Sequence, residues 1–139
     1  MKNIILSSFL ILTLTSCSNK DVNKKEEPKI NAQSQLATIM IKRAQEGDMK
    51  SQNNLGTMYA KGFGIEQDFE KAVFWWEKAA NQGDVIAQNN LGFIYYNGEN
   101  NIEQDYQKSK HWLKKACENG SEISCDKYKS ILKKDKNKN

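Results

Sequence analysis

Residues 53–83 read NNLGTMYAKGFGIEQDFEKAVFWWEKAANQG, and residues 89–120 repeat the pattern as NNLGFIYYNGENNIEQDYQKSKHWLKKACENG. The copies are offset by 36 residues in their first part and, after a one-residue insertion, by 37 residues in their second part. A period in the thirties without strand-like alternation is typical of stacked helix–turn–helix units. The sequence therefore predicts an all-α fold, a right-handed α-solenoid of helix-turn-helix repeats.

The repeated positions also resemble a known family. The pattern NNLGxxYxxGxGI followed by QDxxKAxxWWxKAAxxG is similar to the Sel1-like repeat, a relative of the tetratricopeptide repeat. It is carried here by Asn54, Leu55, Gly56, Tyr59, Gly62, Gly64, Asp68, Lys71, Ala72, Trp75, Trp76, Lys78, Ala79, Ala80 and Gly83. The second copy has Asn100 or Asn101 for Gly64 and Ser109 for Ala72, and both changes fit because asparagine tolerates a left-handed turn and serine is small. The resemblance implies an architecture and leaves function to be argued separately.

The charge of the chain lies mainly in its tails. The formal net charge is +4, but residues 32–132 contain 12 Lys and Arg against 13 Asp and Glu, a net charge of −1. The excess lysines fall within residues 20–29 and 133–138. A body without a basic face is a poor phosphate binder, so no nucleic-acid partner is expected. The tail lysines are interpreted as solubilising ends or contacts to anionic membrane.

The N-terminus is interpreted as a lipoprotein signal peptide, residues 1–16. Lys2 supplies the positive start, and the apolar run Ile4–Leu14 is too short to span a bilayer core of ~30 Å. The residues that end at Cys17, LTSC, resemble the bacterial lipoprotein cleavage box, which implies lipidation of Cys17. In such lipoproteins Ser18 favours the outer membrane, facing the periplasm. An ordinary secretory signal is the alternative.

Beyond the signal we expect a lipidated cysteine and flexible tether at 17–31, a repeat domain at 32–132, and a disordered basic tail at 133–139. The repeat domain should hold about six helices, two full repeats between two half-repeat caps. Their expected ranges are 35–45, 49–60, 68–81, 85–96, 105–118 and 121–132.

Aspartates and glycines mark the expected helix ends. The N-caps are Asp48, Asp68, Asp84 and Asp105, and the C-terminal stops are Gly62 and Gly98. Inside the helices, Gly56 and Gly92 cost roughly 1 kcal/mol each relative to alanine, which indicates close approach of a neighbouring helix. Trp75 and Trp112 are predicted to lie in the core, with Ile39 and Ala44 at the places of Trp75 and Ala80 in the first half-repeat.

Once Cys17 is assigned to lipid, Cys117 and Cys125 remain as a pair. Two antiparallel helices joined by a short turn can bring them within the ~4.4–6.8 Å Cα spacing of a disulfide, which an oxidising compartment allows to form. The spacing also resembles the cysteine-rich branch of the Sel1-like family. A metal site would need more ligands than His111 alone, so no metal is expected.

The sequence offers no catalytic constellation. His111, the single histidine, occupies the place of Phe74. Gly62-Phe63-Gly64 follows a helix and not a strand, so it does not fit a phosphate-binding loop, and no cofactor is expected. Some cysteine-rich relatives are linked to penicillin binding, and an enzyme acting on cell-wall or lactam substrates is kept as an alternative.

The remaining candidate is a surface. In the tetratricopeptide arrangement the first helix of each pair lines the concave side. The residues expected to contact a partner protein or peptide there are Lys50, Asn53, Thr57, Asn89, Phe93 and Tyr96. The two asparagines could clamp a backbone, and the two aromatic residues could anchor a partner. Alternatively, Phe93 and Tyr96 pack on the helix of the preceding pair.

The sequence thus predicts a non-enzymatic, membrane-anchored periplasmic scaffold or adaptor that binds another protein. An immunity protein that neutralises a toxic effector in the periplasm is the main alternative.

Overall fold

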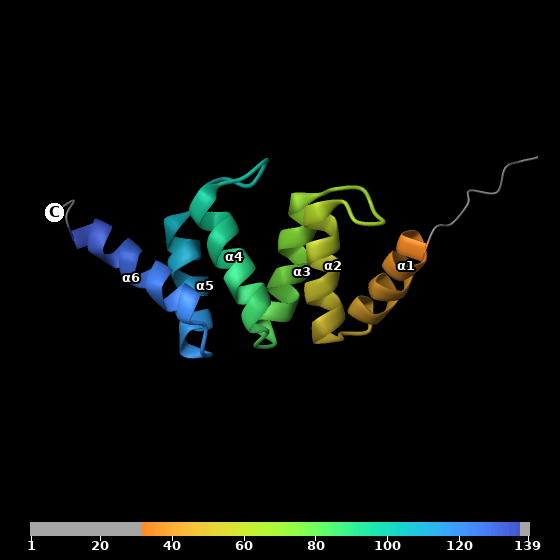
Figure 1. Ribbon diagram of the computed structural model, residues 1–139, viewed down its shortest axis with the longest axis horizontal. Coiled ribbons are helices and arrows are strands. Elements are labelled where there is room, and N and C mark those ends of the chain that lie inside the picture. The colour runs from red at the N-terminus through yellow and green to blue at the C-terminus, as the bar shows by residue number, and fades with distance from the viewer. Residues whose placement is uncertain (1–31, 137–139) are drawn as a thin grey trace, which may run out of the picture.

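The computed structural model describes residues 32–136, with side chains to residue 134, and residues 1–31 and 137–139 lie outside the described part. The predicted signal peptide, Cys17 and tether all fall outside it. The described helices are α1 (Ala32–Gln45), α2 (Met49–Lys61), α3 (Phe69–Asn81), α4 (Val85–Asn97), α5 (Tyr106–Glu118) and α6 (Glu122–Lys136). They follow one another in chain order along the long axis (Figure 1). Within the described residues the fold is the predicted all-α repeat solenoid.

The predicted helix ends are confirmed. Asp48 and Asp84 accept the backbone N–H of the residue three positions on, at 2.7 Å each, and Asp68 and Asp105 make the same contact. The hydrogen bonds from Ser51 lower the pKa of Asp48. Gly62 and Gly98 end α2 and α4 in the left-handed conformation. In the longer second loop Asn100 has φ +58°, so Asn100 is the asparagine that replaces Gly64.

Two helix boundaries differ from the prediction by more than one residue. α1 begins at Ala32, three residues early, and α6 continues to Lys136 instead of ending at Leu132. Residues 133–136 therefore belong to a helix and not to a disordered tail. The extension has a structural cause, because the Lys134 ammonium donates to the Tyr96 hydroxyl at 3.2 Å and so holds α6 against α4.

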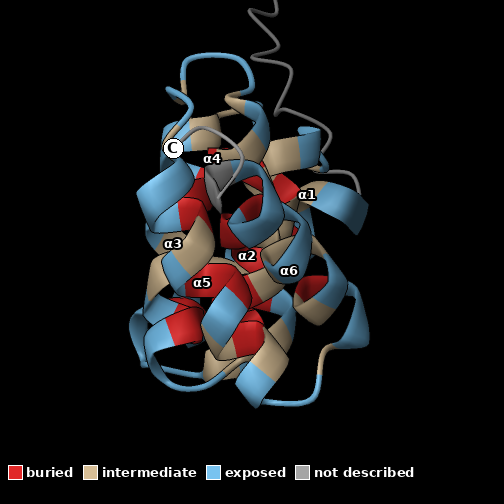
Figure 2. Ribbon diagram, turned by 90° about the vertical axis from the view of Figure 1, so that its left-hand side faces the viewer, coloured by how far each residue is buried: buried red, intermediate tan, exposed pale blue. Residues whose placement is uncertain are grey.

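Within each repeat the paired helices meet at a glycine. A Cβ built on Gly56 would lie 2.6 Å from Trp76 Cδ1, and one built on Gly92 would lie 2.6 Å from Leu113 Cδ2. Leu55 and Leu91, the preceding residues, are fully buried. Figure 2 shows the buried positions on the inward sides of the helices, with exposed residues in the turns and loops. The predicted close approach is confirmed.

The prediction for the two repeat tryptophans is only half right. Trp112 is buried, whereas Trp75 is only partly buried and lies outside the core cluster. The Lys115 ammonium lies 5.1 Å from the Trp112 ring, but the equivalent Lys78 lies over the ring of Phe74 instead. The lysine thus lies over the tryptophan in the second repeat and over the phenylalanine in the first.

The three short turns that join α1 to α2, α3 to α4 and α5 to α6 are built on one plan. In the first turn the buried Gln52 side chain donates to the Ala44 carbonyl at 3.0 Å, and in the second Gln88 donates to Ala80 at 3.1 Å. The equivalent positions in the third turn are Cys117 and Cys125, which form a disulfide with a Cα–Cα distance of 4.6 Å. The predicted disulfide thus replaces a glutamine hydrogen bond.

The same glutamines also link the two helices of their own repeat. The Gln82 amide donates to Gln52 Oε1 at 2.7 Å, and Asn119, which is equivalent to Gln82, donates to Gln88 Oε1 at 3.0 Å. The Tyr95 hydroxyl of α4 also donates to Glu77 of α3 at 3.2 Å. Burial and the nearby Glu77 carboxylate raise the pKa of Tyr95 to about 12. Hydrogen bonds therefore add to apolar packing within each repeat and, through Tyr95, between the two repeats.

Gly92→Ala tests the glycine contact. Alanine would gain about 1 kcal/mol of helix propensity, but the new methyl group would press on the fully buried Leu113, and overpacking costs typically about 1–3 kcal/mol. We expect a net loss of stability in urea unfolding. A more stable variant would contradict the role assigned to this glycine.

A pair of double variants tests the plan of the turns. Cys117→Ala with Cys125→Ala should lose about 2–3 kcal/mol of unfolding free energy, because the covalent link is gone. Cys117→Ala with Cys125→Gln rebuilds the pair found in the other two turns and should recover about 1 kcal/mol. Equal stability of the two variants in denaturant unfolding would show that the third turn follows a different plan.

Candidate protein-binding face

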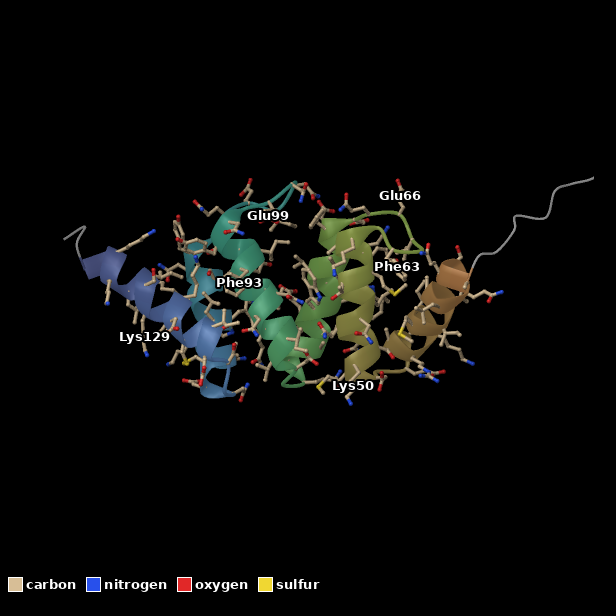
Figure 3. All side chains as sticks on the ribbon, viewed as in Figure 1. Lys50, Phe63, Glu66, Phe93, Glu99 and Lys129 are labelled. Atoms are coloured by element: carbon tan, nitrogen blue, oxygen red, sulfur yellow. A yellow bond between two sulfur atoms is a disulfide. The ribbon has the colours of Figure 1, made fainter. Side chains whose placement is uncertain are left out.

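The six residues predicted to contact a partner all lie on α2 and α4, but they differ in exposure. Lys50 is exposed, and Figure 3 shows it near the start of α2, far from Phe93 in the middle of the array. Asn53 is buried, while Thr57, Asn89, Phe93 and Tyr96 are partly buried. We call the side of the molecule formed by α2, α4 and α6 the first-helix face.

The two asparagines do not form the expected pair of exposed amides. Asn89 Oδ1 accepts hydrogen bonds from the hydroxyls of Ser121, at 2.9 Å, and Ser124. Asn53 is only 7% exposed, and its Oδ1 is buried without a hydrogen-bond partner. Asp84 and Ala87 stand at the positions equivalent to the two serines, and neither side chain offers a donor. Asn89 therefore holds α6 in place. Asn53 is at the equivalent position in the first repeat, but it lacks the two hydroxyl donors.

Thr57 also has a structural role. Its hydroxyl donates to the Asn53 carbonyl at 3.1 Å, and the indole N–H of Trp76 points to the same hydroxyl at 3.4 Å. Trp76 is the side chain that packs against Gly56. Thr57 thus orients the tryptophan on which the α2–α3 pair depends.

Tyr96 is partly buried and contacts side chains that follow it in the chain. The Lys127 ammonium lies 3.6 Å from the centre of its ring, Lys134 donates to its hydroxyl, and the Tyr106 ring meets it edge-on at 5.5 Å. The lysine ammonium groups, led by the hydrogen bond from Lys134, lower the pKa of the Tyr96 phenol. Tyr96 therefore packs on α6 and α5, and not on the preceding pair as the alternative prediction had it.

Phe93 faces the first repeat. It lines a hollow of about 210 Å³ at the interface between the α2–α3 pair and α4, which we call the first-junction hollow. The other lining residues are Ala60, Phe69, Trp76, Asn90, Ile94, Asn97 and Glu99. Sequence reasoning missed this hollow, although the replacement of Tyr96 by Ala60 at the equivalent position signalled that space.

A second hollow, of about 350 Å³, lies beside the uncovered Trp75. Its other lining residues are Ala44, Gln45, Gly47, Gln52 and Lys78. The polar atoms of the Gln52 side chain are already used, since its amide donates to Ala44 and its oxygen accepts from Gln82. A ligand in this hollow would therefore meet the Trp75 ring and the Lys78 side chain, while the polar atoms of Gln52 stay bonded to the protein.

Three further observations concern metal ligands, the single histidine and membrane-spanning helices. Among residues 32–134 no three His, Cys, Asp or Glu side chains are grouped to hold a metal ion. His111 is exposed and its ring meets that of Trp112 edge-on at 4.9 Å. In the described region none of the helices has the length and apolar character needed to cross a membrane.

Ala87→Ser tests the unfinished contact at Asn53. The new hydroxyl would stand where Ser124 stands in the next repeat and would donate to the orphaned Oδ1. A buried polar atom without a partner costs about 1–3 kcal/mol, so the variant should gain about 1 kcal/mol. Ser124→Ala, the matched control, should lose a similar amount. Thermal unfolding measures both, and a destabilised Ala87→Ser would contradict the equivalence.

Comparison with known proteins agrees with this architecture. The sequence profile of the Sel1 repeat matches residues 50–84 and 85–121. No curated protein sequence matches the chain.

Three solved structures have a similar fold. A protective antigen of uropathogenic Escherichia coli strains that displays an SLR fold is 34% identical, with a TM-score of 0.64 over 68% of this chain and 20% of the antigen. A Sel1 repeat protein from Oxalobacter formigenes is 28% identical, with a TM-score of 0.62 over 66% of this chain and 26% of that one. Cysteine rich protein B of Helicobacter pylori is 25% identical, with a TM-score of 0.61 over 66% of this chain and 68% of that one. This chain spans only a fifth to a quarter of the length of the first two.

The two repeats matched by the family profile make up more than half of the residues of this chain. The chain therefore belongs to the Sel1 repeat family.

Proposed function

We propose that this protein is a lipid-anchored adaptor of the bacterial cell envelope that binds another protein through its first-helix face. Sel1 repeats are generally protein–protein interaction modules and typically non-enzymatic scaffolds. The observation that carries the proposal is the first-junction hollow, where Phe93 stands beside open space between two repeats. Aromatic residues next to a pocket are the usual anchors of protein interfaces.

The position of the hollow within the array supports an adaptor. Helices from two repeats form it, so its walls are held by the glycine contacts and hydrogen bonds that fix each repeat. A rigid surface loses little conformational freedom on binding, and this preserves affinity.

The envelope location rests on the sequence. Cys17 ends a lipoprotein-like cleavage box, and a serine follows it. The 14 residues between Cys17 and the described part reach at most about 50 Å when extended. The Cys117–Cys125 disulfide is in keeping with an oxidising compartment. One structural relative is a protective antigen, which also suits an exported protein.

The anchor is tested by Cys17→Ala. Without the lipid, the chain has only its protein contacts to keep it at a membrane, so it should move from the membrane fraction to the soluble fraction. Immunoblotting of the two fractions measures the change. Persistent sedimentation with membranes would refute the lipid anchor and leave the binding face untouched.

The binding face is tested in cells by a photo-crosslinking amino acid. Placed at Phe93, it should capture one predominant partner from the envelope. The matched control is Phe74, an equally aromatic residue that is 50% exposed on α3 and does not line the first-junction hollow. An adduct at position 74 equal to that at position 93, or none at position 93, would contradict the proposed face.

A further inference from the structure

Each helix pair packs against the first helix of the unit that follows it: the α2–α3 pair against α4, and the α4–α5 pair against α6. A comparison of these two interfaces shows what kind of group fills the space between them. At the second interface, between the α4–α5 pair and α6, the Tyr96 side chain fills it. Three neighbours hold this ring. Tyr106 meets its edge, Lys127 lies over its face, and Lys134 binds its hydroxyl.

At the first interface the same space is empty. Ala60 stands where Tyr96 stands in the next repeat, and it lines the first-junction hollow. The equivalents of the three neighbours are Phe69 for Tyr106, Asn90 for Lys127 and Asn97 for Lys134, and all three also line the hollow. The hollow therefore lies where Tyr96 lies in the next repeat and keeps an aromatic neighbour, Phe69. Asparagines replace the two lysines there, and Phe93 stands where α6 has Ser130.

We propose that the first-junction hollow takes a tyrosine side chain of the partner protein, in the position that Tyr96 occupies in the next repeat. The inference rests on the proposed function, because it assumes that a protein binds this face. At about 210 Å³ the hollow is smaller than the ~300–1,000 Å³ of sites for whole small-molecule ligands. A single ring suits it, and a buried aromatic ring is a large contribution to an interface.

The residues that line the hollow determine which form of tyrosine fits it, phosphorylated or unmodified. Trp76 and Ile94 are buried, and with Phe69 they offer apolar contact. Asn97 donates to the Glu99 carboxylate at 2.7 Å, so the rim presents an amide and an acceptor where the second interface presents lysines. A phenol hydroxyl can donate to Glu99, whereas a phosphorylated tyrosine would meet that negative charge without either of the two lysines. The hollow should therefore prefer unmodified tyrosine.

The test uses N-acetyl-tyrosinamide as the probe on the mature protein, observed by the NMR signals of the Asn90 and Asn97 side-chain amides. We expect saturable shifts at these amides with N-acetyl-tyrosinamide. N-acetyl-alaninamide should give none, and the phosphorylated tyrosine derivative should bind about tenfold more weakly or worse. Equal binding of all three probes, or no shift with tyrosinamide, overturns the proposal.

Two variants give opposite results if the hollow is the site. Ala60→Tyr fills it from within, as Tyr96 fills its own place, and should abolish the shifts while the far-ultraviolet circular dichroism is unchanged. Tyr96→Ala opens the second space and should add new shifts near Tyr106 without weakening those at Asn90. If Ala60→Tyr does not fold, Tyr96→Ala still decides. Unchanged binding in a folded Ala60→Tyr, or no new shifts in a folded Tyr96→Ala, refutes the assignment.

Failure of this inference differs from failure of the proposed function. If tyrosinamide does not bind but the crosslink from position 93 persists, the face binds a protein by another contact and the tyrosine proposal is wrong. If tyrosinamide binds and no crosslink forms, the hollow is a tyrosine site and the adaptor proposal is wrong.

Discussion

The contact between a glycine on one helix and a large side chain on its partner is the constraint on which this structure depends. Gly56 receives Trp76 and Gly92 receives Leu113, each at a distance that leaves no room for a Cβ. Because the helices of a pair approach so closely, each pair behaves as one rigid unit. The turns, the interfaces between pairs and the first-junction hollow all take their geometry from these two contacts.

Neighbouring units are joined by polar groups that recur in the same place. A glutamine closes each of the first two turns and accepts a hydrogen bond from the end of its own helix pair. In the third turn a disulfide takes this place and links α6 covalently to α5.

The differences between the copies are more informative than their similarities. Asn89 is satisfied by two serines and Asn53 by none, and Tyr96 fills a space that Ala60 leaves open. Where one copy completes a contact, it shows the chemistry that the other lacks. The first difference leaves Asn53 Oδ1 without a hydrogen-bond partner, and the second is where we place a residue of the partner.

The sequence by itself determined the helix pairs, their caps and the glycine positions, because these recur as identities at a fixed offset. It also indicated the cysteine pairing, because Cys117 and Cys125 lie only eight residues apart across one short turn. It could also have indicated the full length of α6, since no helix breaker follows Leu132 before Lys136. Only the tertiary structure decided that Trp75 is left partly uncovered, that Asn53 and Asn89 are structural, and that Tyr96 packs on α5 and α6. Each of these depends on side chains that meet across different helices, up to 38 residues apart in the case of Lys134 and Tyr96, and such meetings leave no periodic trace in the chain.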